Sequence, residues 1–572
     1  MIVQRGVIVA KHAAPRTMQP PRRMRNRMPE ATPAATVATH SRWMRNAHIA
    51  FVLLVIVGFA LIRFRLRDMP LERDEGEYAY AGQLLLHGIA PYKLAYTMKL
   101  PGTFLAYAAM LAIFGQTSAG VHLGLILVNA TTTLLVCLLA RKLFGQLAGS
   151  VAAASYAVLS ASPTVLGLAG HATHFVLLPA LAGILLLLKA CDSRRTWLFL
   201  GSGALFGLAF LMKQPGIFFA GFGGLYLLFR ESRTRPLNWP AIAARAGAYL
   251  VGLTLPFGLL CLDLAATGSF SKFWFWTFTY AREYGSITGL AEAAAKFQQN
   301  FPAIVGPAFW IWVLAGAGVI ALLWNRTARV HAIFLLAFTA FSFAAVCPGF
   351  YFREHYFILL LPAVALLAGV AVSSATTGLQ AWLHSRVAGV IPAVLFLFAF
   401  GFVIVQQEAF FFEADPIAAC RELYSPNPFP EAVAIADYIR QHSSPQARIA
   451  VFGSEPEIYF YSGRGAATGY IYTYGLTEKQ KYALTMQHEM AGEIEAARPE
   501  YFVYVQIMGS WLAGPDSPHW IFSWADRYLK ENYELAGIAD MSSPQTRYLW
   551  GEAASNYSQQ SSYAVLVYHR KG

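Results

Sequence analysis

Charged residues are scarce in this sequence, and their scarcity limits the classes of protein it can represent. Asp, Glu, Lys and Arg make up 13% of the 572 residues, against about 25% in an average soluble domain, which argues against a purely soluble enzyme. A Walker A loop is also missing, which argues against an ATP-driven pump. The five cysteines include no CxxC pair and no metal-finger spacing, so they indicate neither a disulfide framework nor a zinc module.

Apolar residues are abundant instead. They make up 56% of the chain, the mean hydropathy is +0.44, and several apolar runs reach about 20 residues, enough to cross a hydrocarbon core of about 30 Å. The formal charge of +13 does not indicate a nucleic-acid partner, because residues 1–46 hold nine Lys and Arg against the single acid Glu30 and so carry +8 of it. We interpret this segment as a basic cytoplasmic tail.

The first apolar runs set the expected topology. Ala47–Ile62 follows the basic tail without a small-residue cleavage site, which predicts a retained span and a cytoplasmic N-terminus. Pro101–Gly115 has only 15 residues, about 22 Å of helix, so we expect an interfacial or re-entrant helix. Ala119–Ala140 then becomes the second span, and Arg141 at its end falls on the cytoplasmic side, as the positive-inside rule requires.

The remaining apolar runs bring the expected number of spans to about eleven. They cover residues 146–167, 174–190, 197–212, 215–229, 242–263, 303–324, 331–347, 355–374 and 387–406. An odd number of spans places residues 407–572 outside. Helix-like and strand-like segments alternate there, which predicts a small α/β domain. These segments are Glu431–His442, Arg448–Gly453, Thr477–Ala497, Tyr501–Gln506 and Ala564–His569.

The expected fold is therefore a mainly α-helical, multi-pass protein of the cell (inner) membrane with a C-terminal extracytoplasmic, or periplasmic, α/β domain. Its parts would be the tail 1–46, a transmembrane domain 47–406 with a first outer loop at 68–118, and the outer domain 407–572.

The first outer loop carries the densest group of ionisable residues. Residues 72–77 hold four carboxylates within six positions, and a solvated turn is the ordinary interpretation of such a run. Tyr78, Ala81, Gly82 and Leu85 follow at helical spacing, however, which predicts a helix lying on the bilayer surface with Asp74 at its start. Lys99 stands at the head of the short apolar helix. We therefore expect an acid and a cation at the same depth.

An acid facing an ammonium at the membrane surface suits a reaction whose donor is a lipid phosphate ester. Lys99 would hold the phosphate as it gains charge on leaving. A positioned carboxylate such as Asp74 would take the proton of an attacking hydroxyl or amine.

Several short motifs together resemble the GT-C glycosyltransferases, in particular the bacterial relatives of protein O-mannosyltransferases and of lipid A aminoarabinose transferases. The resemblance covers roughly residues 48–375, and the outer segment around Phe452–Gly463 is also similar to the outer domains of bacterial members. The motifs are Asp74-Glu75, Lys99-Leu-Pro101, Arg141-Lys-Leu-Phe-Gly145, Gly207-Leu-Ala-Phe-Leu-Met-Lys-Gln-Pro215 and Tyr356-Phe-Ile-Leu-Leu-Leu-Pro362.

The resemblance implies a polyprenyl-phosphate sugar donor and inverting transfer on the outer face. It also implies that Asp74 is the catalytic carboxylate with Glu75 beside it, that Lys99 contacts the donor phosphate, and that Tyr78 lies near the donor. Two positions depart from the aminoarabinose transferases: Glu77 stands where they carry Arg, and His174 where they carry Asp. The sugar and the acceptor therefore cannot be copied from those enzymes.

Further candidates for substrate binding lie at predicted outer ends of spans. Lys213 sits at an outer turn, where an ammonium either snorkels to the interface or meets an anion. Arg282, Arg353 and Tyr356 are either substrate contacts or members of interfacial aromatic and ionic belts. His171 and His174 lack a carboxylate within reach by sequence, so we assign no metal and no other cofactor, while leaving a divalent ion open.

We therefore expect an integral-membrane glycosyltransferase that transfers a sugar from a polyprenyl-phosphate donor to an extracytoplasmic glycan, lipid or protein acceptor. One alternative is a flippase or transporter of lipid-linked sugars, which would require charges at the bilayer midplane or inverted repeats. The other is an inactive relative that binds glycans. Replacement of Asp74 by Asn separates them, because it would abolish transfer but leave transport or binding largely intact.

Overall fold

The computed structural model describes residues 33–542 and 545–572, so most of the predicted tail 1–46 lies outside the described residues. Residues 48–572 form one compact unit. The fold and the site described below belong to this unit.

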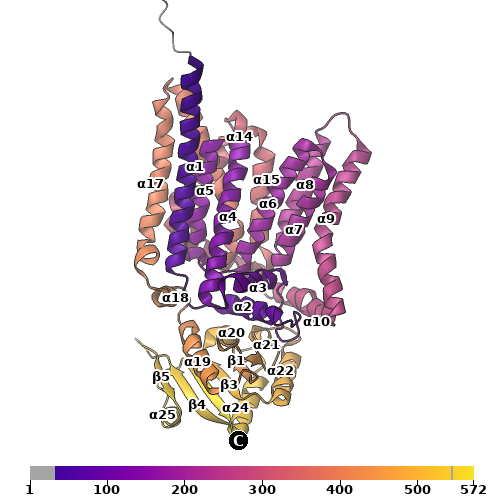
Figure 1. The fold of residues 1–572 in the computed structure, drawn as a ribbon, viewed down its shortest axis with the longest axis vertical. Helices are drawn as coiled ribbons and strands as arrows, with labels where there is room; N and C mark the ends of the chain where they lie inside the picture. Colours follow the sequence, from indigo (N-terminus) through magenta and orange to yellow (C-terminus); the bar gives the residue numbers. More distant parts are fainter. Residues whose placement is uncertain (1–32, 543–544) are drawn as a thin grey trace, which may run out of the picture. The chain divides into compact units, whose positions relative to one another are not determined.

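The apolar runs form the helices of a bundle (Figure 1). Seven helical segments of the described chain are long and apolar enough to cross a membrane on their own, and four further apolar helices are shorter, so the count of about eleven spans stays a prediction. The helices that correspond to the predicted runs are α1 (Pro33–Arg65), α4 (Ser118–Phe144), α5 (Gln146–Ala161), α6 (Ala172–Ser193), α7 (Thr196–Met212), α8 (Gly216–Ser232), α9 (Trp239–Ala266), α12 (Leu290–Val305) with α13 (Phe309–Ala321), α15 (Ala332–Val346), α16 (Leu361–Trp382) and α17 (Val390–Gln406).

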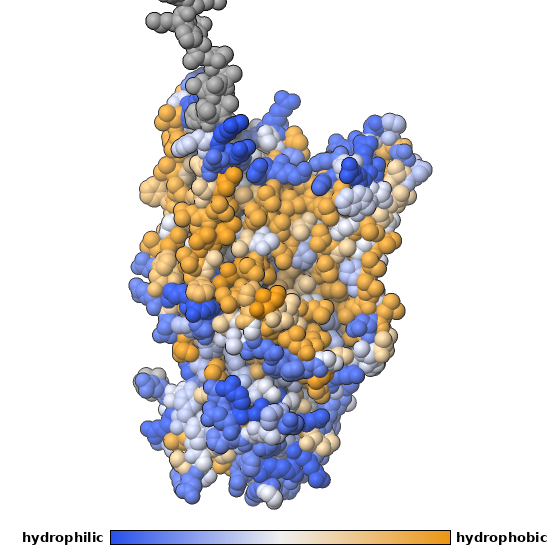
Figure 2. Space-filling view, in the orientation of Figure 1, coloured by the Kyte–Doolittle hydropathy of each residue, from blue (hydrophilic) through white to orange (hydrophobic). Residues whose placement is uncertain are grey.

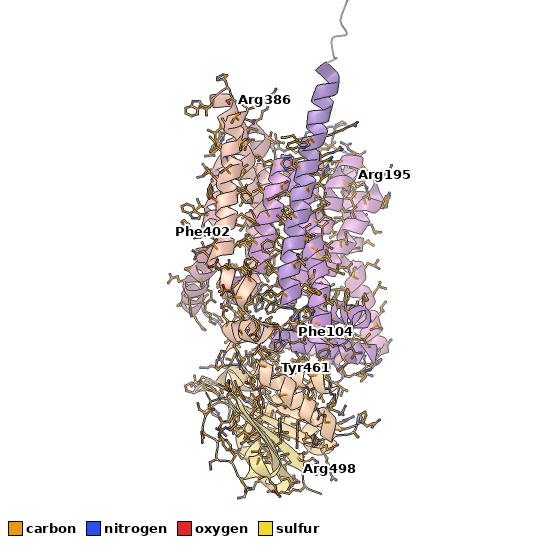
Figure 3. All side chains as sticks on the ribbon, turned by 60° about the vertical axis from the view of Figure 1, so that its left-hand side comes forward. Phe104, Arg195, Arg386, Phe402, Tyr461 and Arg498 are labelled. Carbon is orange, nitrogen blue, oxygen red and sulfur yellow. The ribbon has the colours of Figure 1, made fainter. Side chains whose placement is uncertain are left out.

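The surface of the bundle agrees with a membrane location. On the face that Figure 2 shows, apolar side chains cover the middle of the bundle, while polar side chains gather at the loops of one end and over the C-terminal domain. Figure 3 places Arg195 and Arg386 at the end of the bundle remote from Arg498 of that domain. These arginines belong to loops predicted to be cytoplasmic, so the arrangement follows the positive-inside pattern. The orientation itself stays a prediction.

One predicted span is displaced. The run 355–374 was expected to be helical throughout, but α16 begins only at Leu361 and extends to Trp382. Pro362 occupies the first turn of this helix, where its missing N–H costs no hydrogen bond. Before it, residues 354–359 form a 3-10 helix, and this irregular segment carries Arg353 and Tyr356 to the candidate site.

Two short helices of the first outer loop lie across one end of the bundle (Figure 1). These are α2 (Arg73–Leu86) and α3 (Gly102–Phe114). A non-spanning helix at Pro101–Gly115 and a helix start at Asp74 were both expected. The prediction that α2 lies open on the bilayer surface is wrong, because residues on all its sides are buried. Helix α2 packs on α3 and also on α20 (Glu457–Ser462) of the C-terminal domain.

The C-terminal domain contains one mixed six-stranded sheet. The sequence indicated the strands that begin at Arg448, Tyr501 and Ala564, but not the other three. The order is β2-β1-β3-β6-β4-β5; β1 pairs in parallel with β2 and β3, and the remaining pairs are antiparallel. The strands are β1 (Arg448–Phe452), β2 (Gly465–Ala466), β3 (Tyr501–Gln506), β4 (Tyr533–Asp540), β5 (Arg547–Trp550) and β6 (Ala564–Arg570).

Strand side chains alternate between two cores. Ile449 and Val503 share one core with α2, α3 and α19 (Phe429–His442). Ala450 and Phe502 share the other with α22 (Ala483–Ala497) and α24 (Trp520–Asn532). Because one face of the sheet completes the core of α2, the sheet and the first outer loop fold together.

A close helix contact joins α2 to the sheet domain. A Cβ atom on Gly76 would lie 2.6 Å from the backbone nitrogen of Glu457, so only glycine permits the observed approach of α2 to α20. Tyr80 stacks on Tyr459 with ring centroids 5.1 Å apart. The Tyr80 hydroxyl also accepts a hydrogen bond of 2.9 Å from the backbone N–H of Ala466.

Candidate active site

The N-terminus of α2 positions two carboxylates on one face. Glu72 caps the helix by accepting from the backbone N–H of Glu75, while Glu75 accepts from the backbone N–H of Glu72. This reciprocal capping box fixes where the helix begins. Asp74 and Glu77, three residues apart, therefore project from the same side of α2.

Lys99 meets both of these carboxylates, as the sequence predicted for Asp74. Its ammonium lies 2.7 Å from Asp74 Oδ1 and 2.5 Å from Glu77 Oε2, and it stands over the ring of Tyr78 at 4.7 Å. Neighbouring hydrogen bonds hold the lysine in place, because the Tyr92 hydroxyl donates to the Lys99 carbonyl at 2.7 Å.

The three charges have unequal pKa values. Burial alone would raise the pKa of Asp74, but the Lys99 ammonium and the neighbouring His171 outweigh it and hold that pKa well below its usual range. Burial raises the pKa of Glu77, and Lys99 offsets this only in part. Burial would lower the pKa of Lys99, yet Asp74 and Glu77 raise it well above its ordinary value. Asp74 is thus the ionised partner of a permanent cation.

Asp74, Glu77 and Lys99 line a cavity of about 1240 Å³, part of it open to solvent. The walls come from the first outer loop, from turns at the ends of the bundle helices and from the C-terminal domain. The other lining residues that bear on its chemistry are Lys213, Trp276, Tyr280, Tyr284, Arg353, His355, Tyr356, Tyr472, Tyr474 and Glu478.

Two cations in this cavity have no carboxylate partner among the described residues: Lys213 and Arg353 form no ion pair there, in contrast to Lys99. The Lys213 ammonium lies over the ring of Tyr356 at 4.3 Å. Burial lowers the pKa of Lys213 to about 7, with Lys99 and Arg353 also lowering it and Asp74 opposing them. Cations held without a counterion in a buried cavity favour binding of an anion.

Hydrogen bonds fix the turn that carries Lys213 against the Lys99 loop. The Gln214 amide donates to the Met98 carbonyl at 2.7 Å, and the Thr103 hydroxyl donates to the Met212 carbonyl at 2.7 Å. The two lysines, 114 positions apart in sequence (213 − 99), are therefore held at one site.

Two histidines lie behind Asp74. His171 and His355 stack with ring centroids 4.1 Å apart and an interplanar angle of 12°. Nδ1 of His171 lies 3.9 Å from Asp74 Oδ2 and 3.6 Å from Glu72 Oε1. Sequence reasoning considered His171 together with His174, but the structure pairs it with His355, which comes from a distant segment.

Several aromatic side chains of the cavity were not predicted. Tyr280 donates a hydrogen bond of 2.9 Å to Glu478 Oε2, and both line the cavity with Tyr472 and Tyr474. Tyr280 ends a π-helical turn, Phe275–Tyr280, a local irregularity found often at functional sites. The alternating tyrosines at 470, 472 and 474 were the sequence signal that could have directed attention to this segment.

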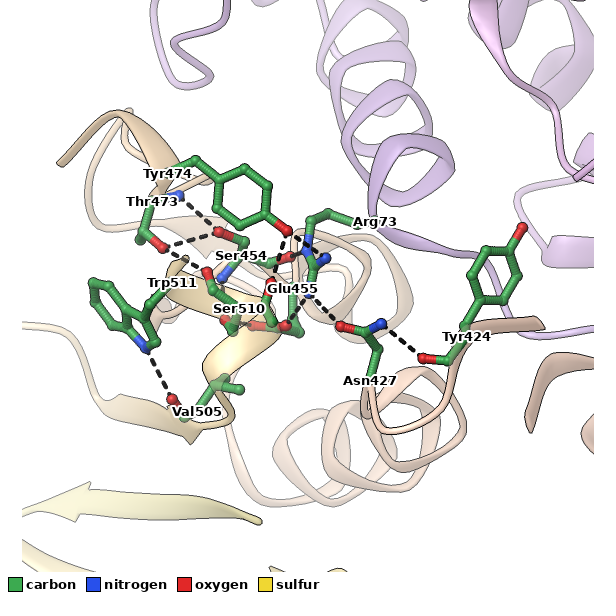
Figure 4. A network of polar contacts seen from close by, with 11 residues as sticks. Arg73, Tyr424, Asn427, Ser454, Glu455, Thr473, Tyr474, Val505, Ser510 and Trp511 are labelled. Atoms are coloured by element: carbon green, nitrogen blue, oxygen red, sulfur yellow. Dashed lines mark hydrogen bonds and ion pairs between the residues drawn. The ribbon is translucent and has the colours of Figure 1, made fainter. Parts of the chain in front are cut away.

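Arg73, next to Asp74, points into the C-terminal domain and joins a buried polar network (Figure 4). Its guanidinium donates to the Ser454 carbonyl at 2.6 Å and to the Tyr474 hydroxyl at 2.7 Å. It also donates to Asn427 Oδ1 at 3.0 Å and to Glu455 Oε1 at 2.9 Å. Burial would lower the pKa of Arg73, but Tyr474 and Glu455 raise it further above its ordinary value.

Four predicted site residues lie outside the lining of the cavity. Glu75 turns away from it: its Oε1 accepts from the Gly170 N–H at 2.5 Å and lies 3.2 Å from His122 Nε2. Tyr78 is buried beneath Lys99. His174 is buried within α6, and neither ring nitrogen has a hydrogen-bond partner among the described residues. Arg282 belongs to the five-residue helix Ala281–Gly285, but only its neighbours reach the cavity.

Comparison with solved structures identifies the class of this fold. ArnT from Cupriavidus metallidurans bound to undecaprenyl phosphate is similar with a TM-score of 0.55 and 16% sequence identity, over 91% of this chain and 97% of that chain. The same protein in the apo state matches with a TM-score of 0.55 and 16% identity, over 92% and 98% of the two chains. AglB from Archaeoglobus fulgidus, in complex with an inhibitory peptide and a dolichol-phosphate, has a TM-score of 0.49 and 13% identity, over 89% and 75%.

The family comparison comes from sequence. Residues 99–259 match the model of the family described as dolichyl-phosphate-mannose-protein mannosyltransferase, so this part of the chain is similar to that family. The predicted resemblance to the GT-C transferases is thereby confirmed, as is a multi-pass helical fold with a C-terminal sheet domain. None of the curated protein sequences matches the chain.

Proposed function

We propose that this protein is an integral-membrane glycosyltransferase that moves one sugar from a polyprenyl-phosphate donor to an extracytoplasmic glycan, lipid or protein acceptor. One observation carries the proposal: an ionised carboxylate, Asp74, lines the same cavity at the end of the bundle as Lys213 and Arg353, two cations that have no carboxylate partner within the described part of the chain. Such a site joins an anion-binding wall to a proton acceptor. The family match and the undecaprenyl phosphate bound by the structurally similar ArnT support the same class of donor.

The donor phosphate would be held by Lys213 and Arg353. A sugar joined to a lipid phosphate carries one negative charge, and in a cavity of low polarity two facing cations stabilise that charge more strongly than they would in water. The sequence indicated Lys99 as the phosphate contact, with Lys213 as a further candidate. The Lys99 ammonium already forms ion pairs with Asp74 and Glu77. We therefore assign it a later role, in which it stabilises the negative charge that develops on the phosphate as it leaves.

The proposed step is a direct displacement. The acceptor oxygen or nitrogen forms a bond to the anomeric carbon while the bond from that carbon to the phosphate oxygen breaks, and the electron pair remains on the phosphate. Attack from the side opposite the leaving group inverts the configuration of the sugar. The proton of the acceptor passes to the Asp74 carboxylate, which acts as the general base.

The low pKa of Asp74 determines when the proton moves. A carboxylate paired with Lys99 is a weak base, so it takes the proton late, after the acceptor atom has become acidic by bonding to carbon. As charge builds on the leaving phosphate, Lys99 is drawn from Asp74 toward that phosphate, and the pKa of Asp74 rises toward its ordinary value. Proton acceptance and phosphate stabilisation are therefore coupled through one ammonium.

The proposal is tested by donor binding to purified protein in lipid nanodiscs. Lys213→Met and Arg353→Gln should each weaken binding of a polyprenyl phosphate at least about tenfold, because each removes one charge facing the phosphate. Lys189→Met and Arg282→Gln remove cations that do not line the cavity and serve as matched controls. Equal affinity in all four variants and the native protein would refute this donor site.

A further inference from the structure

The group formed by Asp74, His171 and His355 is not explained by hydrogen bonding within the protein. Each residue offers one ligand atom, and these atoms lie within 4.8 Å of one another. His171 is only 2% exposed, and neither of its ring nitrogens has a hydrogen-bond partner among the described residues. A buried imidazole with both nitrogens unsatisfied is costly, and at His171, unlike the equally buried His174, a carboxylate oxygen and a second imidazole lie close enough to bind one ion together with it.

From this geometry we infer that Asp74, His171 and His355 form a binding site for one divalent transition-metal ion. The inference rests on the proposed function for its role in transfer, but not for the existence of the site. The carboxylate of Asp74 divides its two oxygens, because Oδ1 bonds to Lys99 at 2.7 Å and Oδ2 faces His171 at 3.9 Å. Oδ2 is therefore free to serve as a ligand while the ion pair with Lys99 persists.

The donor set selects the kind of ion. Two imidazoles and one carboxylate suit zinc, or cobalt in its place, better than magnesium, calcium or manganese, which prefer oxygen ligands. Three protein ligands with one remaining position are also the usual composition of a catalytic zinc site. That position would face substrate, since Asp74 and His355 both line the cavity.

The protonation states agree with metal ligation. Burial lowers the pKa of His171 to about 4, although the Asp74 and Glu75 carboxylates oppose that effect. Burial also lowers the pKa of His355, with His171 and Lys213 lowering it further. Both imidazoles are therefore neutral near pH 7, the form that binds a metal. The close parallel stacking of the two rings is consistent with this, because two imidazolium ions would repel each other.

An ion at this position would act on the leaving group or the acceptor of the proposed reaction. It would add a further positive charge beside the cavity, next to the Asp74 oxygen that does not face Lys99, and would polarise an oxygen atom bound in its open position. Asp74 would keep Oδ1 for Lys99 and for the proton of the acceptor.

The experiment measures metal binding directly on the full-length protein. Protein stripped with a chelator is dialysed against Co²⁺ or Zn²⁺, the bound metal is counted by mass spectrometry, and the visible absorption of Co²⁺ reports its ligands. We expect about one ion per chain and the Co²⁺ absorption of a site with nitrogen ligands. His171→Asn and His355→Asn should each abolish both signals.

His174→Asn is the matched control, since His174 is equally buried and also lacks hydrogen-bond partners among the described residues, but does not belong to the group. It should retain the ion. Thermal unfolding identifies any histidine variant that fails to fold. Asp74→Asn is then measured in place of that variant, and it should lose the bound metal in the same way. Metal content equal in the native protein and the histidine variants, or Co²⁺ absorption unchanged by them, would overturn the inference.

Transfer activity separates this inference from the proposed function. If the ion binds but no sugar is transferred, the site stands and the glycosyltransferase proposal fails. If metal-free protein binds no Co²⁺ and transfers sugar at the full rate, the glycosyltransferase proposal stands and the metal site fails.

Discussion

The Arg73 guanidinium lies 2.9 Å from the Glu455 carboxylate, and this buried ion pair joins the residue beside Asp74 to the C-terminal domain. The C-terminal domain therefore does more than cover the cavity, because it holds the first turn of α2. Glu455 is in turn held by the Ser510 hydroxyl, which donates to it at 2.6 Å. The position of the candidate base depends on a domain that begins more than 300 residues later in the chain (407 − 74).

Replacement of Arg73 by Lys tests this positioning role. Lysine keeps the charge but cannot make the four hydrogen bonds of the guanidinium. The first turn of α2 would then be held less firmly, and the Asp74 carboxylate would no longer keep one orientation. We expect kcat for sugar transfer to fall about 10- to 100-fold with a much smaller change in KM for the donor, because misplacement of a reacting group costs this much. Arg67→Lys, an exchange at a partly exposed site just before this loop, is the control. Parallel losses in both variants would contradict the assignment.

The close approach of α2 to α20 predicts a stability effect at Gly76. A methyl group there meets the backbone of Glu457 rather than a movable side chain, so Gly76→Ala should destabilise the protein by about 1–3 kcal/mol, the usual cost of overpacking. Gly492→Ala lies in α22 with nothing within 4 Å of the added atom and should be neutral or slightly stabilising. Thermal unfolding in detergent compares the two, and an equal melting temperature for Gly76→Ala and the native protein would exclude the contact.

The lowered pKa of Lys213 predicts that donor binding depends on pH. Its pKa of about 7 in the free site reflects burial first, then the charges of Lys99 and Arg353 against that of Asp74. A bound phosphate raises this pKa, so binding is strongest below pH 7, where the ammonium is already charged, and weakens as the pH rises through 7 toward the pKa of the complex. The sugar-phosphate diester has no ionisation in this range.

Calorimetry in buffers of different ionisation enthalpy measures the linked proton. At pH 8 donor binding should take up close to one proton, and Lys213→Met should remove this uptake. Lys189→Met should leave it unchanged. Proton uptake that persists in Lys213→Met would assign the titration to another group.

The sequence was sufficient to predict the ion pair at the centre of the site but not its surroundings. Asp74 and Lys99 belong to one loop whose two helices begin at recognisable signals, so their meeting followed from local structure. The sequence alone did not show which carboxylates of the loop face the cavity, because successive residues of a helix point in directions about 100° apart. The capping box of Glu72 turns Asp74 toward Lys99 and Glu75 toward Gly170.

Contacts between distant segments could not be predicted. His171 and His355 are separated by several spans, and their stacking depends on how α6 and the 3-10 turn before α16 pack. Tyr472 and Tyr474 line the cavity from the C-terminal domain, far along the chain from Asp74 and Lys99. Strands β4 and β5 were missed because neither alternates between buried and exposed positions: β4 ends in four consecutive buried residues, and no residue of β5 is buried.

The central claim is that Asp74 accepts the proton in sugar transfer. It is tested most directly in source cells that carry Asp74→Asn as the only copy, by mass spectrometry of envelope glycoconjugates and polyprenyl-phosphate sugars. Asp68→Asn, an exposed acid of the same loop, is the control. We predict that one sugar mass disappears from its acceptor and the corresponding polyprenyl-phosphate sugar accumulates in Asp74→Asn cells alone, because loss of a general base lowers the rate about 10²- to 10⁴-fold. Unchanged glycans and donor levels in those cells would contradict the claim.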